Sequence, residues 1–382
     1  MIKKLLVVVC CFMFVCLYPV QVHAEDLKLA PNAASSILME ASSRQVLYSS
    51  QEKEKMFPAS TTKIMTMILM FEAINNGTLK WDDVLTCSAY AASMGGSQVY
   101  LKEGEQMSVS DLFKAISIAS ANDACVMVGE RIAGSNDGFV NMMNEKAKKL
   151  KLTNTHFMNA TGLHDDNHYT CAQDLATMAA YLIEIGKEKL FAITSLYDSY
   201  IRENSDQKFW LVNTNKLLKS YQGADGLKTG YTTEAGYCIV STAKRNGLRL
   251  IAVVLKEKEP KVRNQEVSQL LDYGFSLYES KIMFEKGELI EKIKIENAKE
   301  KYIYVVSKED VVYVLDKSSK EKVTYQMNYT HIVPPLKKGE TVGHILLMKG
   351  EHNIGSFEVV SKKEVLPLSL GEKIYNYFVM FI

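Results

Sequence analysis

The sequence predicts an α/β domain, built as an antiparallel sheet of about five strands flanked by helices, followed by a small all-β domain. Two apolar segments near the start, 36–39 and 46–48, are separated by a polar turn, which is typical of a β-hairpin. Strand patterns return after Trp210, and an Asn-Gly pair joins two of the segments there. Because these strands come as hairpins, we expect them to be antiparallel. The three later strands are expected at 226–231, 237–242 and 248–255.

The middle of the chain supplies the helices. Pro58 suits the entry to a helix because it cannot donate to the helical ladder. The apolar run that follows, 64–71, is too long and too uniform for a surface helix, so we expect a buried helix that stops at Asn75-Asn76-Gly77. Further helices are expected at 112–119, 139–150, 172–186 and 267–278.

From about residue 282 the pattern changes to short strands separated by turns. This change predicts a boundary between a first domain, 25–281, and an all-β domain, 282–366, that carries no obvious chemistry. The strands of the second domain are expected at 302–306, 311–315, 323–327, 344–348 and 357–360.

Residues 1–24 have the features of a signal peptide. Lys3 and Lys4 precede an apolar run from Leu5 to Leu17, and Val22-His23-Ala24 is a small-residue cleavage signal. A retained anchor is the alternative, although the run is short for a span. We therefore expect an exported protein that acts at the outer face of the cytoplasmic membrane or in the cell wall space.

The C-terminal segment, 367–382, is expected to form an amphipathic helix that lies on the membrane surface. It is too short to span a bilayer. Lys373 is its one lysine, so electrostatic attraction to lipid headgroups would be weak. The alternative is a terminal segment packed on the protein's own surface. The apolar face of the helix would carry Leu370, Ile374, Tyr377, Phe378 and Phe381.

Composition excludes several functions. Once residues 1–24 are removed, 43 basic and 44 acidic residues remain, and this balance gives no reason to expect nucleic acid binding. We expect no metal and no other cofactor. His164 and His168 are four residues apart, but their segment is polar and turn-like, so a surface loop is preferred to a metal site. The four cysteines outside the signal segment, which we expect to be small core residues rather than a disulfide framework, are Cys87, Cys125, Cys171 and Cys238.

The candidate catalytic chemistry begins with Ser60 and Lys63. Residues i and i+3 share a helix face, so the hydroxyl and the amine should lie side by side. An amine in an apolar setting loses hydration and its pKa falls, so a neutral Lys63 could take the proton of Ser60 and make it a nucleophile. On this motif alone, a helix cap with a solvated lysine remains the alternative.

Two further motifs follow in order. Ser120-Ala121-Asn122 comes 60 residues after Ser60, and Lys228-Thr229-Gly230 comes on a predicted strand 108 residues later. The order S-x-x-K, S-x-N, K-T-G, after an export signal, resembles the serine penicillin-binding proteins and active-site serine β-lactamases. The chain most resembles the low-molecular-mass D-alanyl-D-alanine carboxypeptidases, over about residues 30–382, and the resemblance implies their transpeptidase fold.

The resemblance also implies roles for the catalytic residues. Ser60 would attack the carbonyl between two terminal D-alanines of a peptidoglycan pentapeptide, with Lys63 as base. Ser120 would relay the proton to the departing D-alanine. Water would then hydrolyse the acyl-enzyme, whereas β-lactam antibiotics would form the same ester and block turnover.

Binding roles are implied for the other motif residues. Asn122 would hold the substrate backbone, and the Thr229 hydroxyl would bind the terminal carboxylate. Lys228 would supply charge for that carboxylate and would keep Lys63 neutral. Gly230 would leave room for the substrate, and the backbone N–H of Tyr231 would share the oxyanion with that of Ser60.

Two rival functions are weighed against this one. A class A β-lactamase favours S-D-N and a glutamate in an E-x-x-x-N context, whereas Ala121 stands at the middle position here and no glutamate between the second and third motifs has that context. A non-catalytic wall-binding protein is the other rival, but all three motifs are intact. A carboxypeptidase is therefore the function that the sequence predicts.

Overall fold

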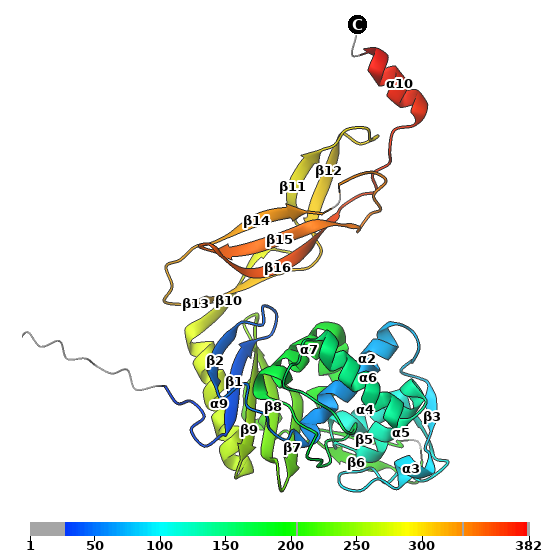
Figure 1. Cartoon of the computed structure of the whole chain (residues 1–382), viewed down its shortest axis with the longest axis vertical. Coiled ribbons are helices and arrows are strands. Elements are labelled where there is room, and N and C mark those ends of the chain that lie inside the picture. The colour runs from blue at the N-terminus through cyan, green and yellow to red at the C-terminus, as the bar shows by residue number, and fades with distance from the viewer. Residues whose placement is uncertain (1–26, 204, 331, 380–382) are drawn as a thin grey trace, which may run out of the picture.

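The computed structural model describes residues 27–203, 205–330 and 332–379. Its first domain is a sheet covered by helices, and its second is an elongated β domain that follows helix α9 (Figure 1). The signal peptide predicted at 1–24 lies outside the described residues. Within them, no helix is both long enough and apolar enough to cross a membrane.

The central sheet has five antiparallel strands in the order β2-β1-β9-β8-β7. The N-terminal hairpin joins the C-terminal strands because β1 pairs with β9, for example Leu38 with Ala252. This confirms the predicted antiparallel sheet. It also leaves β7, which carries Lys228, at an edge. The strands are β1 Ser35–Glu40, β2 Val46–Ser50, β7 Ala224–Thr232, β8 Gly236–Arg245 and β9 Leu248–Glu257.

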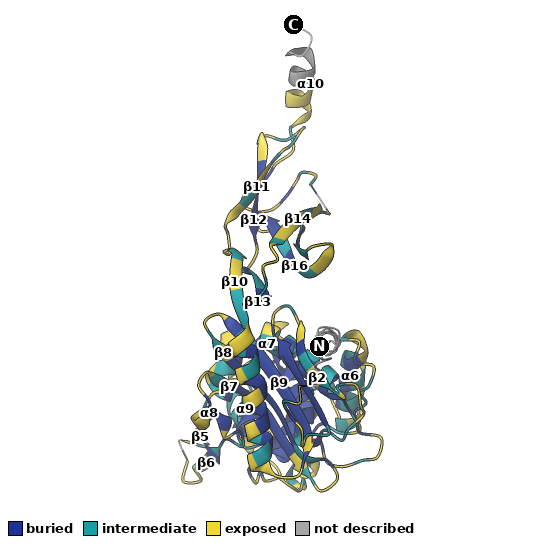
Figure 2. Cartoon of the chain, turned by 90° about the vertical axis from the view of Figure 1, so that its left-hand side faces the viewer, coloured by how far each residue is buried: buried dark blue, intermediate teal, exposed yellow. Residues whose placement is uncertain are grey.

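Helices cover both faces of this sheet, as the burial colours of Figure 2 show for β9. Successive strand residues point to opposite faces. Leu250 and Ala252 pack with helix α9, Pro260–Leu277, whereas Ile251 and Val253 pack with the large cluster that includes α2, Lys63–Asn75, and α7, Ala172–Thr194. The site therefore forms on the face of the sheet that is covered by α2.

The predicted helices are present with shifted limits. Helix α2 has ten buried residues and its C-cap is Asn76, as expected. Helix α7 continues to Thr194 past an interruption at Lys187, and α9 begins at Pro260 because proline suits the first helical position. The remaining helical segments are η1 Ala59–Thr62, α3 Ala89–Ala92, α4 Val109–Ser117, α5 Asn122–Ala133, α6 Asn136–Lys149 and α8 Leu217–Ser220.

Two short antiparallel strand pairs were not predicted. β3, Val84–Thr86, pairs with β4, Gln106–Ser108, and β5, Asp198–Ile201, pairs with β6, Phe209–Val212. These strands have three or four residues each, which is too short for an alternating pattern to stand out.

The second domain is all β, as predicted. Its main sheet runs β11-β12-β16-β15-β14, and a separate pair joins β10, Tyr278–Phe284, to β13, Val311–Asp316. The expected boundary at 281/282 falls inside β10, which continues directly from α9. The other strands are β11 Leu289–Lys294, β12 Tyr302–Ser307, β14 Val323–Tyr329, β15 Thr341–Lys349 and β16 His352–Ser361.

A C-terminal helix, α10, spans Leu370–Val379 and lies at the far end of the β domain (Figure 1). Leu370 and Ile374 on this helix are 76% and 51% exposed. The four cysteines predicted to be core residues are buried and unpaired, and they are Cys87, Cys125, Cys171 and Cys238.

Candidate active site

Ser60 lies on the short turn that leads into α2. The turn, Ala59–Thr62, is a 3₁₀ helix and α2 itself begins at Lys63, so Ser60 is not inside the α-helix that the sequence suggested. Ala59 has a φ of 46°, which is unusual for a residue with a side chain. This left-handed residue turns the chain sharply just before Ser60.

Lys63 is fully buried at the start of α2. Its Nζ lies 2.9 Å from Ser60 Oγ, 2.7 Å from Asn122 Oδ1 and 2.7 Å from the carbonyl oxygen of Thr161. The predicted contact between Ser60 and Lys63 is present, and the alternative of a solvated lysine is excluded.

These three neighbours fix how a neutral Lys63 would be oriented. The Thr161 carbonyl and the Asn122 amide oxygen can only accept hydrogen bonds. A neutral amine has two N–H groups and one lone pair, so both N–H groups go to these oxygens. The lone pair is left for the third neighbour, and the Ser60 hydroxyl can donate its proton to it. This is the arrangement that a general base needs.

Burial lowers the pKa of Lys63 from 10.5 to about 8. The nearby Asp123 carboxylate acts in the opposite direction, since negative charge favours the ammonium form. A useful fraction of Lys63 is therefore neutral near neutral pH.

Lys228 is also fully buried, and its Nζ donates to the carbonyl of Thr229 at 2.9 Å. Burial first, and the charge of Lys63 second, hold the pKa of Lys228 well below its usual value. Burial therefore disfavours the charged form of both amines. Burial is the largest cause of the lowered pKa of Lys63, and the expected contribution of the Lys228 charge remains a prediction.

The second motif crosses from a loop into α5. Ser120 has a φ of 66° and is buried, and its Oγ makes no hydrogen bond within the part of the chain that the structure describes. The relay by Ser120 therefore remains a prediction. Asn122 uses its oxygen on Lys63 and its Nδ2 on the carbonyl of Gly95, at 2.7 Å each. One N–H and one lone pair of this amide remain for another partner, so the expected contact with substrate stays a prediction.

The third motif lies on β7 against the Ser60 turn. A Cβ at Gly230 would lie 2.8 Å from the backbone nitrogen of Ser60, so this glycine is required by the close approach of two protein segments, rather than by room for substrate alone. Thr229 Oγ1 donates to Thr214 Oγ1 at 2.7 Å. Tyr231 is 55% exposed and its ring stacks on Tyr237 at 4.3 Å.

The structure adds residues that sequence reasoning did not assign. Thr161 and Gly95 act through backbone carbonyls, which no side-chain pattern reveals. Thr214 was missed as well.

The segment that contains His168 was expected to be a surface loop, and for His168 this expectation is wrong. It is buried beside Thr62, with Nε2 2.8 Å from the threonine hydroxyl, and burial lowers its pKa to about 4. It is therefore neutral. Among residues 27–203, 205–330 and 332–379, no group of three or more metal-ligating side chains comes together.

Comparison with known proteins accounts for this geometry. A family model described as D-alanyl-D-alanine carboxypeptidase matches residues 21–259, and a model of the C-terminal domain of penicillin-binding protein 5 matches residues 278–366. The chain belongs to the D-alanyl-D-alanine carboxypeptidase family. The resemblance suggested by the three motifs is thus confirmed.

Relatives of this carboxypeptidase family match most of the chain. D-alanyl-D-alanine carboxypeptidase DacF of Bacillus subtilis is 42% identical over 343 residues, which cover 88% of this chain and 87% of the relative. Penicillin binding protein 5 of Haemophilus influenzae has a solved structure with 29% identity and a TM-score of 0.70, covering 88% of this chain and 98% of that one. Penicillin-Binding Protein D2 of Listeria monocytogenes, solved in an ampicillin-bound form, is 33% identical with a TM-score of 0.58. The match covers 64% of this chain and 98% of that one. These matches confirm the predicted transpeptidase fold.

The lowered pKa of Lys63 predicts the pH dependence of acylation. Lys63 must be neutral to accept the Ser60 proton, so the second-order rate constant for labelling by fluorescent penicillin should rise with pH and level off above about 8. Lys63→Arg, which stays protonated, should remain inactive at every pH. A wild-type rate that does not change from about pH 6 to about pH 10 would contradict Lys63 as the base.

Gly230→Ala tests the contact between β7 and the Ser60 turn. The added Cβ would press on the Ser60 N–H, so acylation should slow by about 10² to 10³, the typical effect of losing one oxyanion donor. The melting temperature, measured in parallel, separates this effect from unfolding. A folded variant with the wild-type acylation rate would show that the close approach is unimportant.

Proposed function

We propose that this protein is a serine-type D-alanyl-D-alanine carboxypeptidase that removes the terminal D-alanine from peptidoglycan stem peptides through an acyl-enzyme on Ser60. The observation that carries the proposal is the buried Lys63 amine, with two fixed acceptors and the Ser60 hydroxyl at 2.9 Å. Family membership supplies the substrate class.

Acylation would proceed as follows. Ser60 Oγ attacks the carbonyl carbon between the two D-alanines while its proton passes to Lys63 Nζ. The backbone N–H groups of Ser60 and Tyr231 stabilise the oxyanion of the tetrahedral intermediate. The C–N bond then breaks, and Ser120 passes the proton from Lys63 to the leaving amine of D-alanine. The product is an ester between Ser60 and the shortened peptide.

Recognition of the terminal carboxylate would fall to the third motif. The Thr229 hydroxyl lies on the edge strand β7 and would turn its one proton from Thr214 Oγ1 to an incoming carboxylate oxygen. Burial lowers the pKa of Lys228 in the free protein, and a carboxylate beside it would act in the opposite direction, so substrate binding would favour the charged amine.

Deacylation uses water, with Lys63 again placed to take a proton. A β-lactam antibiotic would acylate the same serine but leave its amine tethered, which blocks the approach of water and makes the enzyme penicillin-sensitive. The ampicillin-bound Listeria neighbour supports this part of the proposal. Removal of the terminal D-alanine takes away a donor for cross-linking, so the proposed role is control of cross-link density and cell shape.

We also propose that the protein is exported and held at the outer face of the cytoplasmic membrane by its C-terminal helix. The apolar run near the N-terminus supports export, and the exposed side chains of Leu370 and Ile374 on α10 support contact with lipid.

Release of D-alanine tests the catalytic proposal. The wild type should release one D-alanine from a synthetic pentapeptide ending in D-Ala-D-Ala, and Ser60→Ala should release none above background. Fluorescent penicillin should label the wild type and not the variant. Rapid turnover of a chromogenic cephalosporin would indicate a β-lactamase instead, and failure of the wild type to label would indicate a non-catalytic wall-binding protein.

Vesicle sedimentation tests the membrane proposal. The chain 25–382 should sediment with vesicles that contain anionic lipid, and a chain that ends at Pro367 should stay in solution. Replacing both Leu370 and Ile374 with serine should weaken binding, because these side chains would enter the lipid interface. Equal sedimentation of the full and shortened chains would rule the anchor out.

A further inference from the structure

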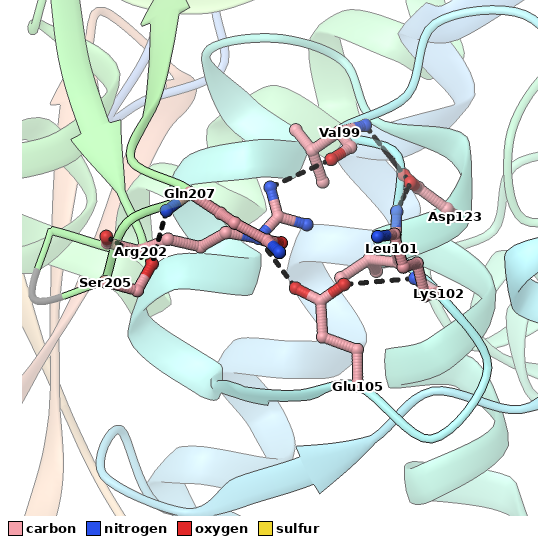
Figure 3. A network of polar contacts seen from close by, with 8 residues as sticks. All are labelled: Val99, Leu101, Lys102, Glu105, Asp123, Arg202, Ser205 and Gln207. Atoms are coloured by element: carbon pink, nitrogen blue, oxygen red, sulfur yellow. Dashed lines mark hydrogen bonds and ion pairs between the residues drawn. The ribbon is translucent and has the colours of Figure 1, made fainter.

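Asp123 is a fully buried carboxylate on α5 that has no assigned part in the chemistry above. Figure 3 shows it beside the loop that precedes β4. Its Oδ2 accepts from the backbone N–H groups of Val99 at 3.1 Å and Leu101 at 3.0 Å, and its Oδ1 accepts from that of Ala124 at 2.9 Å. Both oxygens are therefore used to hold backbone, and two of these three hydrogen bonds go to the loop.

Arg202 holds the same loop from the other side. Its Nη1 donates to the carbonyl of Val99 at 3.0 Å, and its Nε pairs with Glu105 at 2.6 Å (Figure 3). Val99 is thus fixed through both its N–H and its C=O. Because hydrogen bonds hold both the N–H and the C=O of Val99, the loop has little freedom to move at this residue.

The fixed loop in turn orients the side chain of Asn122. The carbonyl of Gly95 accepts from Asn122 Nδ2 at 2.7 Å, and the carbonyl of Ser97 accepts from Asn122 N at 2.7 Å. Because a carbonyl can only accept, the NH₂ end of the amide must face Gly95 and the oxygen must face Lys63. The loop packs closely against this amide, since a Cβ at Gly96 would lie 2.8 Å from Asn122 Nδ2.

The orientation of this amide decides where the Lys63 lone pair points. With the oxygen toward Lys63, an N–H of the neutral amine is used on Asn122 and the lone pair is left for Ser60. With the amide turned over, its NH₂ would donate to Lys63 and take up the lone pair. Lys63 could then no longer accept the Ser60 proton.

We infer that Asp123 is a positioning residue for the Ser60–Lys63 pair, acting through the 95–101 loop and the Asn122 amide. This inference rests on the proposed function and adds a residue to its machinery. Asp123 touches neither the substrate nor the reacting atoms.

Asp123 also acts on Lys63 through its charge. The titratable groups that surround Lys63 are Asp123 and Cys125 on α5, Lys228 on β7 and His168 before α7. Of these, Asp123 and Cys125 raise the pKa of Lys63, against the larger effect of burial. Loss of the Asp123 charge should therefore lower the pKa of Lys63 further, a change that loss of loop order alone would not produce.

Asp123→Asn is the test. The variant keeps the shape of the side chain but turns an NH₂ group toward backbone N–H donors, so the loop should loosen. We expect the rate constant for acylation by fluorescent penicillin to fall by up to about 100-fold, as for other misplacements of a catalytic group. We also expect its pH profile to move to lower pH than that of the wild type.

Two further variants separate orientation, charge and stability. Gly96→Ala crowds Asn122 Nδ2 and keeps the Asp123 charge, so it should slow acylation without moving the pH profile. Asp174→Asn removes a comparable buried carboxylate, in the first turn of α7, that accepts from Asn154 N and Thr155 Oγ1. It should lower the melting temperature and leave both the acylation rate and the pH profile of the folded protein unchanged.

The outcomes are distinct. If Asp123→Asn loses stability as Asp174→Asn does but keeps the wild-type rate and profile, Asp123 is only structural and the inference is wrong. If Asp123→Asn does not fold, Gly96→Ala decides, and a wild-type rate in that variant would overturn the inference. A wild type that is not acylated at all would instead refute the proposed function.

Discussion

Burial of the Lys63 amine is the constraint on which the rest of the site depends. A charged amine without water is costly, so the folded environment favours the neutral form. Helix α2 creates that environment, because ten of its thirteen residues are buried and Lys63 is the first of them. The apolar run 64–71, which is too long and too uniform for a surface helix, therefore provides the burial that lets Lys63 act as a base.

Neutrality alone would not produce a base, since the lone pair must also point at the nucleophile. Two acceptors from distant parts of the chain supply this direction, Asn122 from the start of α5 and Thr161 from the segment before α7. Close backbone approaches hold these parts together. A Cβ at Gly162 would lie 1.8 Å from the carbonyl oxygen of Ala59, and one at Gly230 would lie 2.8 Å from Ser60 N. Packing at glycine thus sets the geometry of the catalytic turn from two sides.

The sequence predicted the local part of this arrangement well. The contact between Ser60 and Lys63 follows from their spacing, and the five-stranded sheet follows from hairpins with clear turns. What it could not predict acts through the backbone or through burial in three dimensions. The Thr161 carbonyl cannot be recognised from side-chain type, and the lowered pKa values of Lys63 and Lys228 depend on their burial in the fold. The same is true of His168, which is buried although its neighbours in sequence are polar.

Direct titration of the Lys63 amine is the measurement that tests the central claim most closely. The protein would carry ¹³C at the ε-carbon of lysine, and the signal that disappears in Lys63→Arg would be assigned to Lys63 and followed by NMR as pH is raised. The account predicts a midpoint near 8, well below the 10.5 of an exposed lysine. A midpoint at or above the value for an exposed lysine would mean that Lys63 stays charged in the folded protein, and it could not then act as the base.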